Sequence, residues 1–154
     1  MAKLLTDGDK LFDNDGERQF ELEKWVDTAP FEDLLGITIE EAKEGRAVLS
    51  MPFMVKLAQG GGFLHGGALT TLADTAVALA IKTLLPEGTV FATTELTTRF
   101  LAPVRQGRVT AAAAVSPPRG RTFHGEAVVS DESGREVVRF SSVFRVARGQ
   151  GFEE

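Results

Sequence analysis

A long apolar segment that contains a single acidic residue constrains this chain more than any other feature. After Gly66 and Gly67, helix-forming residues continue without interruption to Leu85, and Pro86 ends the run. Apolar residues recur at helical spacing and also fill most of the other side, which is typical of a helix buried on nearly every face: Leu69, Leu72, Ala73, Ala76, Val77, Ala78, Leu79, Ala80, Ile81 and Leu84. Asp74 lies in the middle of this segment. Burial of a lone carboxylate is costly, so Asp74 needs a partner or a function.

Strand-like segments lie on both sides of this helix in the sequence. Two precede it, Gly36–Ala42 and Arg46–Phe53, with a turn at Glu44-Gly45. Four follow it, and turns at Pro103–Gly107, Pro117–Gly120 and Asp131–Gly134 separate them: Val90–Leu101, Arg108–Val115, Arg121–Ser130 and Arg135–Val146. Tight turns require antiparallel neighbours, and the long connection lets the helix lie across one face of the sheet. The sequence therefore predicts an α+β fold.

The first part of the chain is expected to be an acidic extension of this unit. Residues 1–44 carry 13 acidic and 5 basic side chains, whereas residues 45–154 carry 9 acidic and 12 basic ones. Gly16–Ala29 is predicted to be an amphipathic helix that Pro30 ends, and Phe31, Leu34, Leu35 and Ile37 indicate a short helical turn after it. We expect an extension over residues 1–29, a folded domain over 30–147 and a loose tail over 148–154.

Composition excludes several classes of function. A length of 154 residues with 43% hydrophobic content suits one domain with a real core, and no segment has the pattern of a membrane span or a signal peptide. The absence of cysteine excludes disulfides, a thiolate nucleophile and a zinc–thiolate site, and two histidines make a poor metal cage. We expect a cytoplasmic protein with no cofactor and no metal.

Four arginines are the only local basic excess. They suffice for contact with a phosphorylated small molecule, or they are a solvated surface, but they are too few for a nucleic-acid footprint: Arg105, Arg108, Arg119 and Arg121. The glycines do not form a G-x-G-x-x-G motif, because His65 stands where the last glycine would be. No Lys-Ser/Thr follows at phosphate-loop spacing, and no Gly-x-Ser-x-Gly elbow of a serine hydrolase occurs.

Several short motifs together resemble those of a known family. Gln59, His65-Gly66-Gly67, Leu72-Ala73-Asp74 and Phe100-Leu-Ala-Pro103 are similar to those of acyl-CoA thioesterases in the phenylacetate-degradation (PaaI-like) branch of the hotdog-fold superfamily. The resemblance spans residues 30–147. It implies a hotdog fold, in which a curved antiparallel sheet wraps around one central helix, and an acyl-CoA substrate. It also implies a homodimer with shared active sites, commonly doubled into a tetramer. The helix predicted over Gly16–Ala29 lies outside the resemblance and is an extra N-terminal helix.

Thioester hydrolysis needs a group that attacks the carbonyl or activates water, and a donor that holds the developing oxyanion. The N–H groups of Gly66 and Gly67 at the helix start suit the donor, although two glycines can also simply permit a tight turn. The resemblance implies that Asp74 is the nucleophile or the general base, and the sequence does not choose between these. A structural carboxylate is the alternative for Asp74.

Three further residues are assigned supporting roles. The resemblance implies that His65 positions the donor or the substrate, and that Gln59, which stands where PaaI-like enzymes commonly carry asparagine, contacts the carbonyl or orients water. Thr93 aligns with a Ser or Thr used near the attacking water, yet strand alternation places it on the same face as Glu95 and Thr97, which is expected to be solvated or between subunits. Relatives that act on aryl-CoA carry Ser or Thr where this chain has Ala78, which argues against that variant.

Two functions from different classes remain open. One is an acyl-CoA thioesterase, and the other is a non-catalytic acyl-CoA-binding or regulatory hotdog protein in which Asp74 is an interface residue. The dehydratase branch of the fold usually arranges its Asp and His differently. Gly66 and Asp74 are separated by about 12 Å along the predicted helix, so a thioesterase site would need two chains with antiparallel helices. The acyl group is not readable from the sequence.

Overall fold

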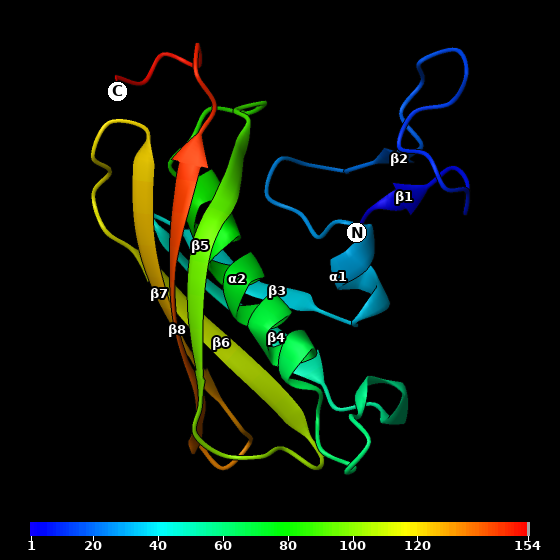
Figure 1. The fold of residues 1–154 in the computed structure, drawn as a ribbon, viewed down its shortest axis with the longest axis vertical. Coiled ribbons are helices and arrows are strands. Elements are labelled where there is room, and N and C mark those ends of the chain that lie inside the picture. Colours follow the sequence, from blue (N-terminus) through cyan, green and yellow to red (C-terminus); the bar gives the residue numbers. More distant parts are fainter. Residues whose placement is uncertain (154) are drawn as a thin grey trace.

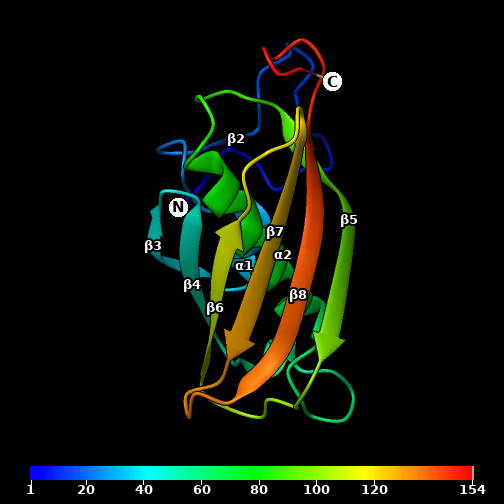
Figure 2. The same cartoon turned by 90° about the vertical axis from the view of Figure 1, so that its left-hand side faces the viewer.

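The computed structural model describes residues 1–153 and confirms an α+β fold. One helix, α2 (Gly66–Lys82), lies across one face of an antiparallel sheet (Figure 1). In spatial order the sheet contains β3 (Thr38–Lys43), β4 (Arg46–Pro52), β6 (Arg108–Val115), β7 (Thr122–Ser130), β8 (Glu136–Val146) and β5 (Phe91–Phe100). Figure 2 shows the other face of this curved sheet, with α2 behind it.

Tight turns produce the antiparallel order, as the sequence predicts. Between β3 and β4, Glu44 and Gly45 have φ of 52° and 75°, the left-handed conformation that a two-residue hairpin turn requires. In the turn between β7 and β8, the Asp131 N–H donates to the Arg135 carbonyl at 2.9 Å. The helix and strand positions predicted between residues 36 and 146 are confirmed, with shifts of one to three residues at most ends.

The core lies between α2 and the sheet. Leu72, Ala73, Ala76, Val77 and Ala80 on α2 are fully buried, and they pack against side chains that alternate along the strands. On β8 the alternating buried set is Val138, Phe140, Ser142, Phe144 and Val146, and Val137 is buried as well. Because these residues face the sheet, the side of α2 that carries Thr70, Asp74 and Ala78 is only partly buried.

The N-terminal part differs from the prediction of a helix over Gly16–Ala29. It contains two short strands, β1 (Lys3–Leu4) and β2 (Phe20–Glu21), followed by bends, and a five-residue helix, α1 (Pro30–Leu34), begins at the proline. Proline suits the first position of a helix because its φ is preset and no N–H is needed there. Pro30 therefore begins a helix rather than ending one.

Asp27 explains the missing helix. Its buried carboxylate accepts hydrogen bonds from the backbone N–H groups of Glu23 and Thr28, at 3.1 and 2.8 Å. These two N–H groups therefore cannot form the hydrogen bonds of a helix, because the Asp side chain competes with backbone carbonyl groups for them. The segment bends instead and lies on the α2 side of the sheet (Figure 1).

Two further features complete the fold. A short 3-10 helix, η1 (Val55–Leu57), precedes the glycine-rich loop that enters α2. Among residues 1–153, no helix is both long and apolar enough to cross a bilayer.

Candidate active site

One side of α2 faces β5, the strand at the edge of the sheet. Gly66, Thr70 and Asp74 lie along this side, because residues four apart share a helix face. Their neighbours on β5, in the same order, are Phe100, Thr98 and Thr93. The chemistry-bearing residues of α2 are thus on its least covered side, next to an edge strand.

Asp74 is held by a hydrogen bond from β5. The Thr93 hydroxyl lies 3.0 and 3.1 Å from the two carboxylate oxygens of Asp74, so its single proton is shared between them. Burial raises the pKa of the Asp74 carboxyl, while the Thr93 bond opposes this rise and the charge of Glu32 adds to it. Among residues 1–153, Asp74 has no cation within 4 Å. The carboxylate is half-buried, oriented and more basic than usual.

A β-bulge explains how Thr93 reaches Asp74. Strand alternation predicts that Thr93 shares a face with Glu95, but the register with β8 shifts between these two residues: Thr93 pairs with Phe144, and Glu95 pairs with Val143. The extra residue, Thr94, reverses the alternation, so Thr93 points to the α2 side. The face predicted for Thr93 is therefore wrong, whereas its proximity to the carboxylate is found in the structure.

His65 caps the start of α2. Its Nδ1 accepts a hydrogen bond from the Gly67 N–H at 2.8 Å, so in the neutral ring the proton lies on Nε2. The Gly67 N–H is therefore occupied by the His65 side chain. The Gly66 N–H has no hydrogen-bond partner among the described residues. It is the available donor at the positive end of the helix dipole.

Gly66 also allows close contact with β5. An added Cβ would lie 3.0 Å from Cζ of Phe100, so the absence of a side chain is what lets this ring cover the first turn of α2. In the sequence alone, Phe100 stands out only as part of the Phe100–Pro103 motif. Phe100 is two residues from Thr98, so both side chains point to the same face of β5. Gly66 and Thr70 are four residues apart on α2, and this pair of spacings could have predicted that Phe100 contacts Gly66.

Gln59 lies in the loop before α2. Its side-chain oxygen accepts a hydrogen bond from the Gly61 N–H, so the amide is turned onto its own loop. The His65 N–H donates to the Leu57 carbonyl at 2.9 Å, which fixes this loop beside the start of α2.

A hollow of about 410 Å³ lies beside the donor end of α2. Its walls come from α1, η1 and the first turns of α2, and most are apolar: they include Phe31, Leu35, Leu57, Ala58, His65 and Thr71. Its volume and lining are typical of a small-molecule site.

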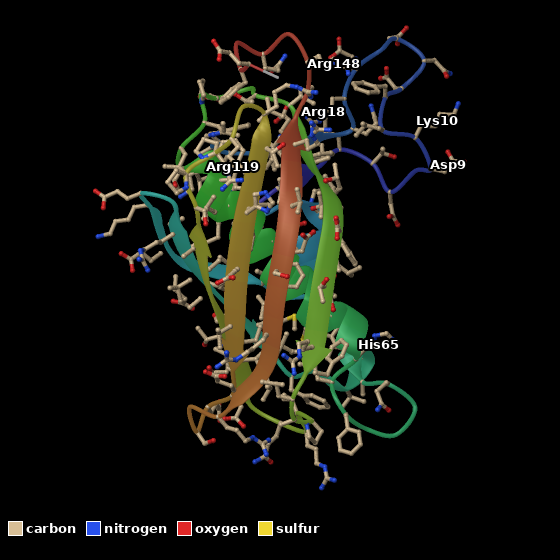
Figure 3. The ribbon with its side chains drawn as sticks, turned by 60° about the vertical axis from the view of Figure 1, so that its left-hand side comes forward. Asp9, Lys10, Arg18, His65, Arg119 and Arg148 are labelled. Atoms are coloured by element: carbon tan, nitrogen blue, oxygen red, sulfur yellow. The ribbon has the colours of Figure 1, made fainter. Side chains whose placement is uncertain are left out.

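The four arginines predicted to bind the substrate are not together in space. Arg105 lies at the α2 N-terminal end, with its guanidinium 4.8 Å from the centre of the Phe63 ring. Arg108 donates to the Ser50 hydroxyl at 2.9 Å. Arg119 and Arg121 follow β6 at its other end, and Figure 3 shows Arg119 and His65 at opposite ends of the sheet.

Arg121 is buried and donates to the Val146 carbonyl at 2.8 Å, which is a structural contact. The four residues do not form a single patch on one chain, because an extended strand separates residues that are close in sequence. No group of three or more His, Asp or Glu side chains within residues 1–153 is arranged to hold a metal ion.

The chain is similar in sequence and in fold to known proteins. The family model described as the thioesterase superfamily matches residues 61–138, which include α2, β5, β6 and β7. A 1,4-dihydroxy-2-naphthoyl-CoA hydrolase of Listeria monocytogenes is 32% identical over 103 residues, which cover 66% of this chain and 83% of that protein. The PaaI protein from the phenylacetic acid degradation operon of E. coli has a TM-score of 0.72 and 28% identity, covering 79% of this chain and 87% of that one.

A candidate esterase of Halobacterium salinarum is 35% identical over 89 residues, which cover 54% of this chain. The chain spans 59% of the length of that relative and about half the length of a further one from Saccharolobus solfataricus.

Proposed function

The chain belongs to the thioesterase superfamily, and we propose that it hydrolyses an acyl-CoA thioester to a free acid and CoA. The observation that carries this proposal is the state of Asp74. A carboxylate that only stabilised the fold would be expected to have a cation or several donors, because burial without them is unfavourable. Asp74 has one hydroxyl partner and a raised pKa, which suits a group that reacts.

Two routes are open to Asp74. As a general base it removes a proton from water, the water oxygen attacks the thioester carbon, and the C–S bond breaks with release of the CoA thiol. As a nucleophile it forms a mixed anhydride as the thiol leaves, and water then hydrolyses the anhydride to regenerate the carboxylate. Thr93 supports both routes because its bond fixes the direction of the carboxylate oxygens.

The Gly66 N–H is the proposed oxyanion donor. A backbone N–H in a fixed helix start needs no reorganisation when the carbonyl oxygen becomes negative, and such donors are commonly worth 10²- to 10³-fold in rate. His65 supports this donor indirectly, because its bond to the Gly67 N–H holds the first turn in place. We assign Gln59 and Gly67 to the same end of the site without a direct bond to the reacting atoms.

The site is proposed to form between two chains. Gly66 and Asp74 are on one continuous helix, about 12 Å apart along its axis, which is too far for both to act on one carbonyl carbon. A two-fold axis near Thr70, with the two α2 helices antiparallel, brings Asp74 of one chain to Gly66 of the other. Each dimer then has two equivalent sites.

Exposed apolar side chains support a partner on this side of the molecule. They lie on α1, which packs on α2, and on β5, whose outer edge is unpaired: Phe31, Leu34, Leu96 and Phe100 are 42–61% exposed. Large apolar groups around an uncovered helix side favour association.

The substrate is assigned in two parts. We propose that the apolar hollow between α1 and α2 takes the acyl group, and that Arg105 contacts the CoA phosphates at the same end of α2. Both lie beside the Gly66 donor, as a single bound thioester requires.

The first test is release of free thiol from a panel of aryl and alkyl CoA thioesters. Asp74→Asn should lower turnover by about 100-fold or more while the protein stays folded and dimeric. A wild-type protein that binds these thioesters without releasing thiol would instead be the non-catalytic binding protein, and near-normal turnover in Asp74→Asn would remove Asp74 from the mechanism.

Complementation tests the shared site. Asp74→Ala chains and Gly66→Pro chains, the latter lacking the donor N–H at a position that tolerates proline, should each be nearly inactive. When the two are co-expressed, half the dimers are mixed and each has one intact site, so activity should return to about a quarter of wild type. No recovery in a sample shown to contain folded mixed dimers would place the whole site in one chain.

A further inference from the structure

The two edges of the sheet differ in how well they are protected against another strand. At one edge, β3 has six residues, of which three are charged, and its pairing with β4 is irregular between Ile39 and Glu41. At the other edge, β5 has ten residues, and none of them is lysine or proline, which commonly block an edge. Figure 2 shows β5 at the border of the sheet. Its unpaired backbone can accept a further strand.

The backbone of β5 shows which residues are free to pair. The Leu101 N–H donates to the Val137 carbonyl at 2.8 Å, toward β8. Backbone groups alternate between the two sides of a strand, so the other odd-numbered residues of this stretch also point theirs to β8, whereas Leu96 and Thr98 point theirs to the free edge. The bulge at Thr94 ends the regular stretch. A strand added to this edge would therefore hydrogen-bond to Leu96 and Thr98.

Arg99 on β5 lacks the acidic partner that its position requires. It lies directly opposite Arg139 of β8, and like charges in such a pair are unfavourable. Arg139 has a counter-ion, because it donates to the Glu136 carboxylate at 2.9 Å. Among residues 1–153, no carboxylate lies within 4 Å of the Arg99 guanidinium.

Glu95 is the complementary group on the same face of β5. It is exposed like Arg99, and within residues 1–153 it has no cation within 4 Å. The two residues are four apart in an extended strand, a separation of about 13 Å, so they cannot form an ion pair within one chain.

A second copy of β5 can satisfy both charges. When two identical antiparallel strands are related by a two-fold axis perpendicular to the sheet, one residue lies opposite its own copy, because opposite side chains point to the same face. With Thr97 in that position, Glu95 of each chain lies opposite Arg99 of the other. Registers centred on Leu96 or Thr98 leave both charges opposite uncharged residues, and those centred on Glu95 or Arg99 place like charges together.

The register centred on Thr97 also agrees with the backbone and with the proposed arrangement of α2. It pairs Leu96 of one chain with Thr98 of the other, which are the residues with free backbone groups. The hydroxyl oxygens of Thr98 and Thr70 are 3.2 Å apart, and the two-fold axis of α2 is proposed to pass near Thr70. An axis beside Thr97 therefore brings the helix start of one chain toward the carboxylate of the other.

We propose that Glu95 and Arg99 select a second copy of this chain and set the register in which β5 pairs with β5. The inference rests on the two-chain site of the proposed function and names the contact that aligns it. Each dimer gains two equivalent ion pairs on the outer face of the sheet. A strand with other charges at these two positions is a poorer partner, since charge complementarity gives specificity and sets register.

Single cysteines test the register, because the chain has none of its own. Opposite residues of a pair that is not hydrogen-bonded have Cα atoms about 4.5 Å apart, within the range of a disulfide. Thr97→Cys should therefore form a disulfide-linked dimer on mild oxidation. Glu95→Cys and Arg99→Cys should do so only when the two proteins are mixed. Cross-linking of Leu96→Cys or Thr98→Cys in place of Thr97→Cys would overturn the register.

Charge reversal tests the ion pairs. Arg99→Glu and Glu95→Arg each place like charges opposite one another at both positions, so each should raise the dimer Kd about ten-fold or more in sedimentation equilibrium. A mixture of the two variants has opposite charges at both positions and should dimerise like wild type, which also excludes misfolding as the cause. Single variants that dimerise as tightly as wild type, or a mixture no tighter than its components, would reject the ion pairs.

Lys43→Glu is the matched control. It changes the net charge by the same amount as Arg99→Glu, but Lys43 lies on β3 at the opposite edge of the sheet, where it pairs with Glu41 at 3.1 Å. The dimer Kd should therefore stay unchanged. Equal weakening by Lys43→Glu would assign the effect to net charge and overturn the inference.

Cross-linking and the dimer Kd do not depend on turnover, so failure of the proposed function is separable from failure of this inference. If a wild-type dimer releases no thiol, hydrolysis is refuted, and the cross-links and Kd values then decide the ion pairs. If wild type is a thioesterase whose dimer is indifferent to both charge reversals, the ion pairs alone are refuted. A monomeric wild-type protein that releases thiol would refute both this inference and the shared site.

Discussion

Gly125→Ala should destabilise the protein because α2 and β7 have no space for one more methyl group. A Cβ at Gly125 would lie 2.3 Å from Cγ1 of Val77, more than 1 Å closer than ordinary carbon contact. Such overpacking costs about 1 to 3 kcal/mol. For a chain of this length that is a fall in Tm of about 2 to 12 °C in a thermal unfolding experiment.

The same change should reduce activity, because α2 carries both Gly66 and Asp74. A shift of the helix by about 1 Å can cost 10²-fold in rate when reacting groups move out of line. Turnover of Gly125→Ala, measured well below its Tm, should therefore fall although no residue of the site is altered.

Val77→Ala provides the matched test. It removes the clashing methyl groups, and by itself it leaves a cavity worth about 1 to 3 kcal/mol. In the double variant the new methyl fills that space, so the loss of stability should be smaller than the sum of the two single losses by about 0.5 kcal/mol or more. Additive losses, or a Gly125→Ala protein as stable as wild type, would refute the close packing of α2 on β7.

Three further predictions follow from the site. Thr93→Val removes the hydrogen bond that opposes the raised pKa of Asp74, so the acidic limb of the kcat/KM profile should move to higher pH, and an unmoved limb would exclude this bond from the mechanism. Asp74→Asn should raise Tm at pH 7 relative to wild type. The folded pKa of Asp74 is raised, so its ionisation removes stability as pH rises, and the gain should vanish below pH ~3.9, the unfolded value. Arg105→Glu should raise KM for CoA esters and leave N-acetylcysteamine esters unchanged, and equal effects on both would show that Arg105 does not bind phosphate.

Much of the fold is predictable from the sequence because its signals are local. Pro86 ends the helical run, and the positive-φ turn at Glu44-Gly45 and the Asp131–Gly134 turn separate the strands. Because α2 is apolar on nearly every side, the sequence predicts that a sheet packs around it and buries these side chains. The carboxylate of Asp74 was conspicuous for the same reason, since it is the single acidic group in that helix.

The features that sequence reasoning missed depend on contacts between distant residues. The bulge at Thr94 follows from the register of β5 against β8, and alternation within one strand cannot detect it. Residues 16–29 have the apolar spacing of a helix, but the Asp27 carboxylate accepts hydrogen bonds from two of their backbone N–H groups, and the segment bends instead. Arg105 and Arg121 are close in sequence, but the length of β6 separates their neighbourhoods.

The helix α2 contributes both to the hydrophobic core and to the candidate active site. The apolar faces of α2 form the core, and the side that faces β5 carries Gly66, Thr70 and Asp74. The packing that holds α2 in place also removes water from Asp74 and raises the pKa of its carboxyl. Ionised Asp74 therefore lowers the stability of the fold at neutral pH. In the proposed mechanism, the same raised pKa makes the carboxylate a better base or nucleophile. In the proposed mechanism the helix keeps the Gly66 donor and the Asp74 carboxylate apart, so a second chain would have to supply the missing group. Dimerisation would then be a condition of the chemistry rather than an addition to it.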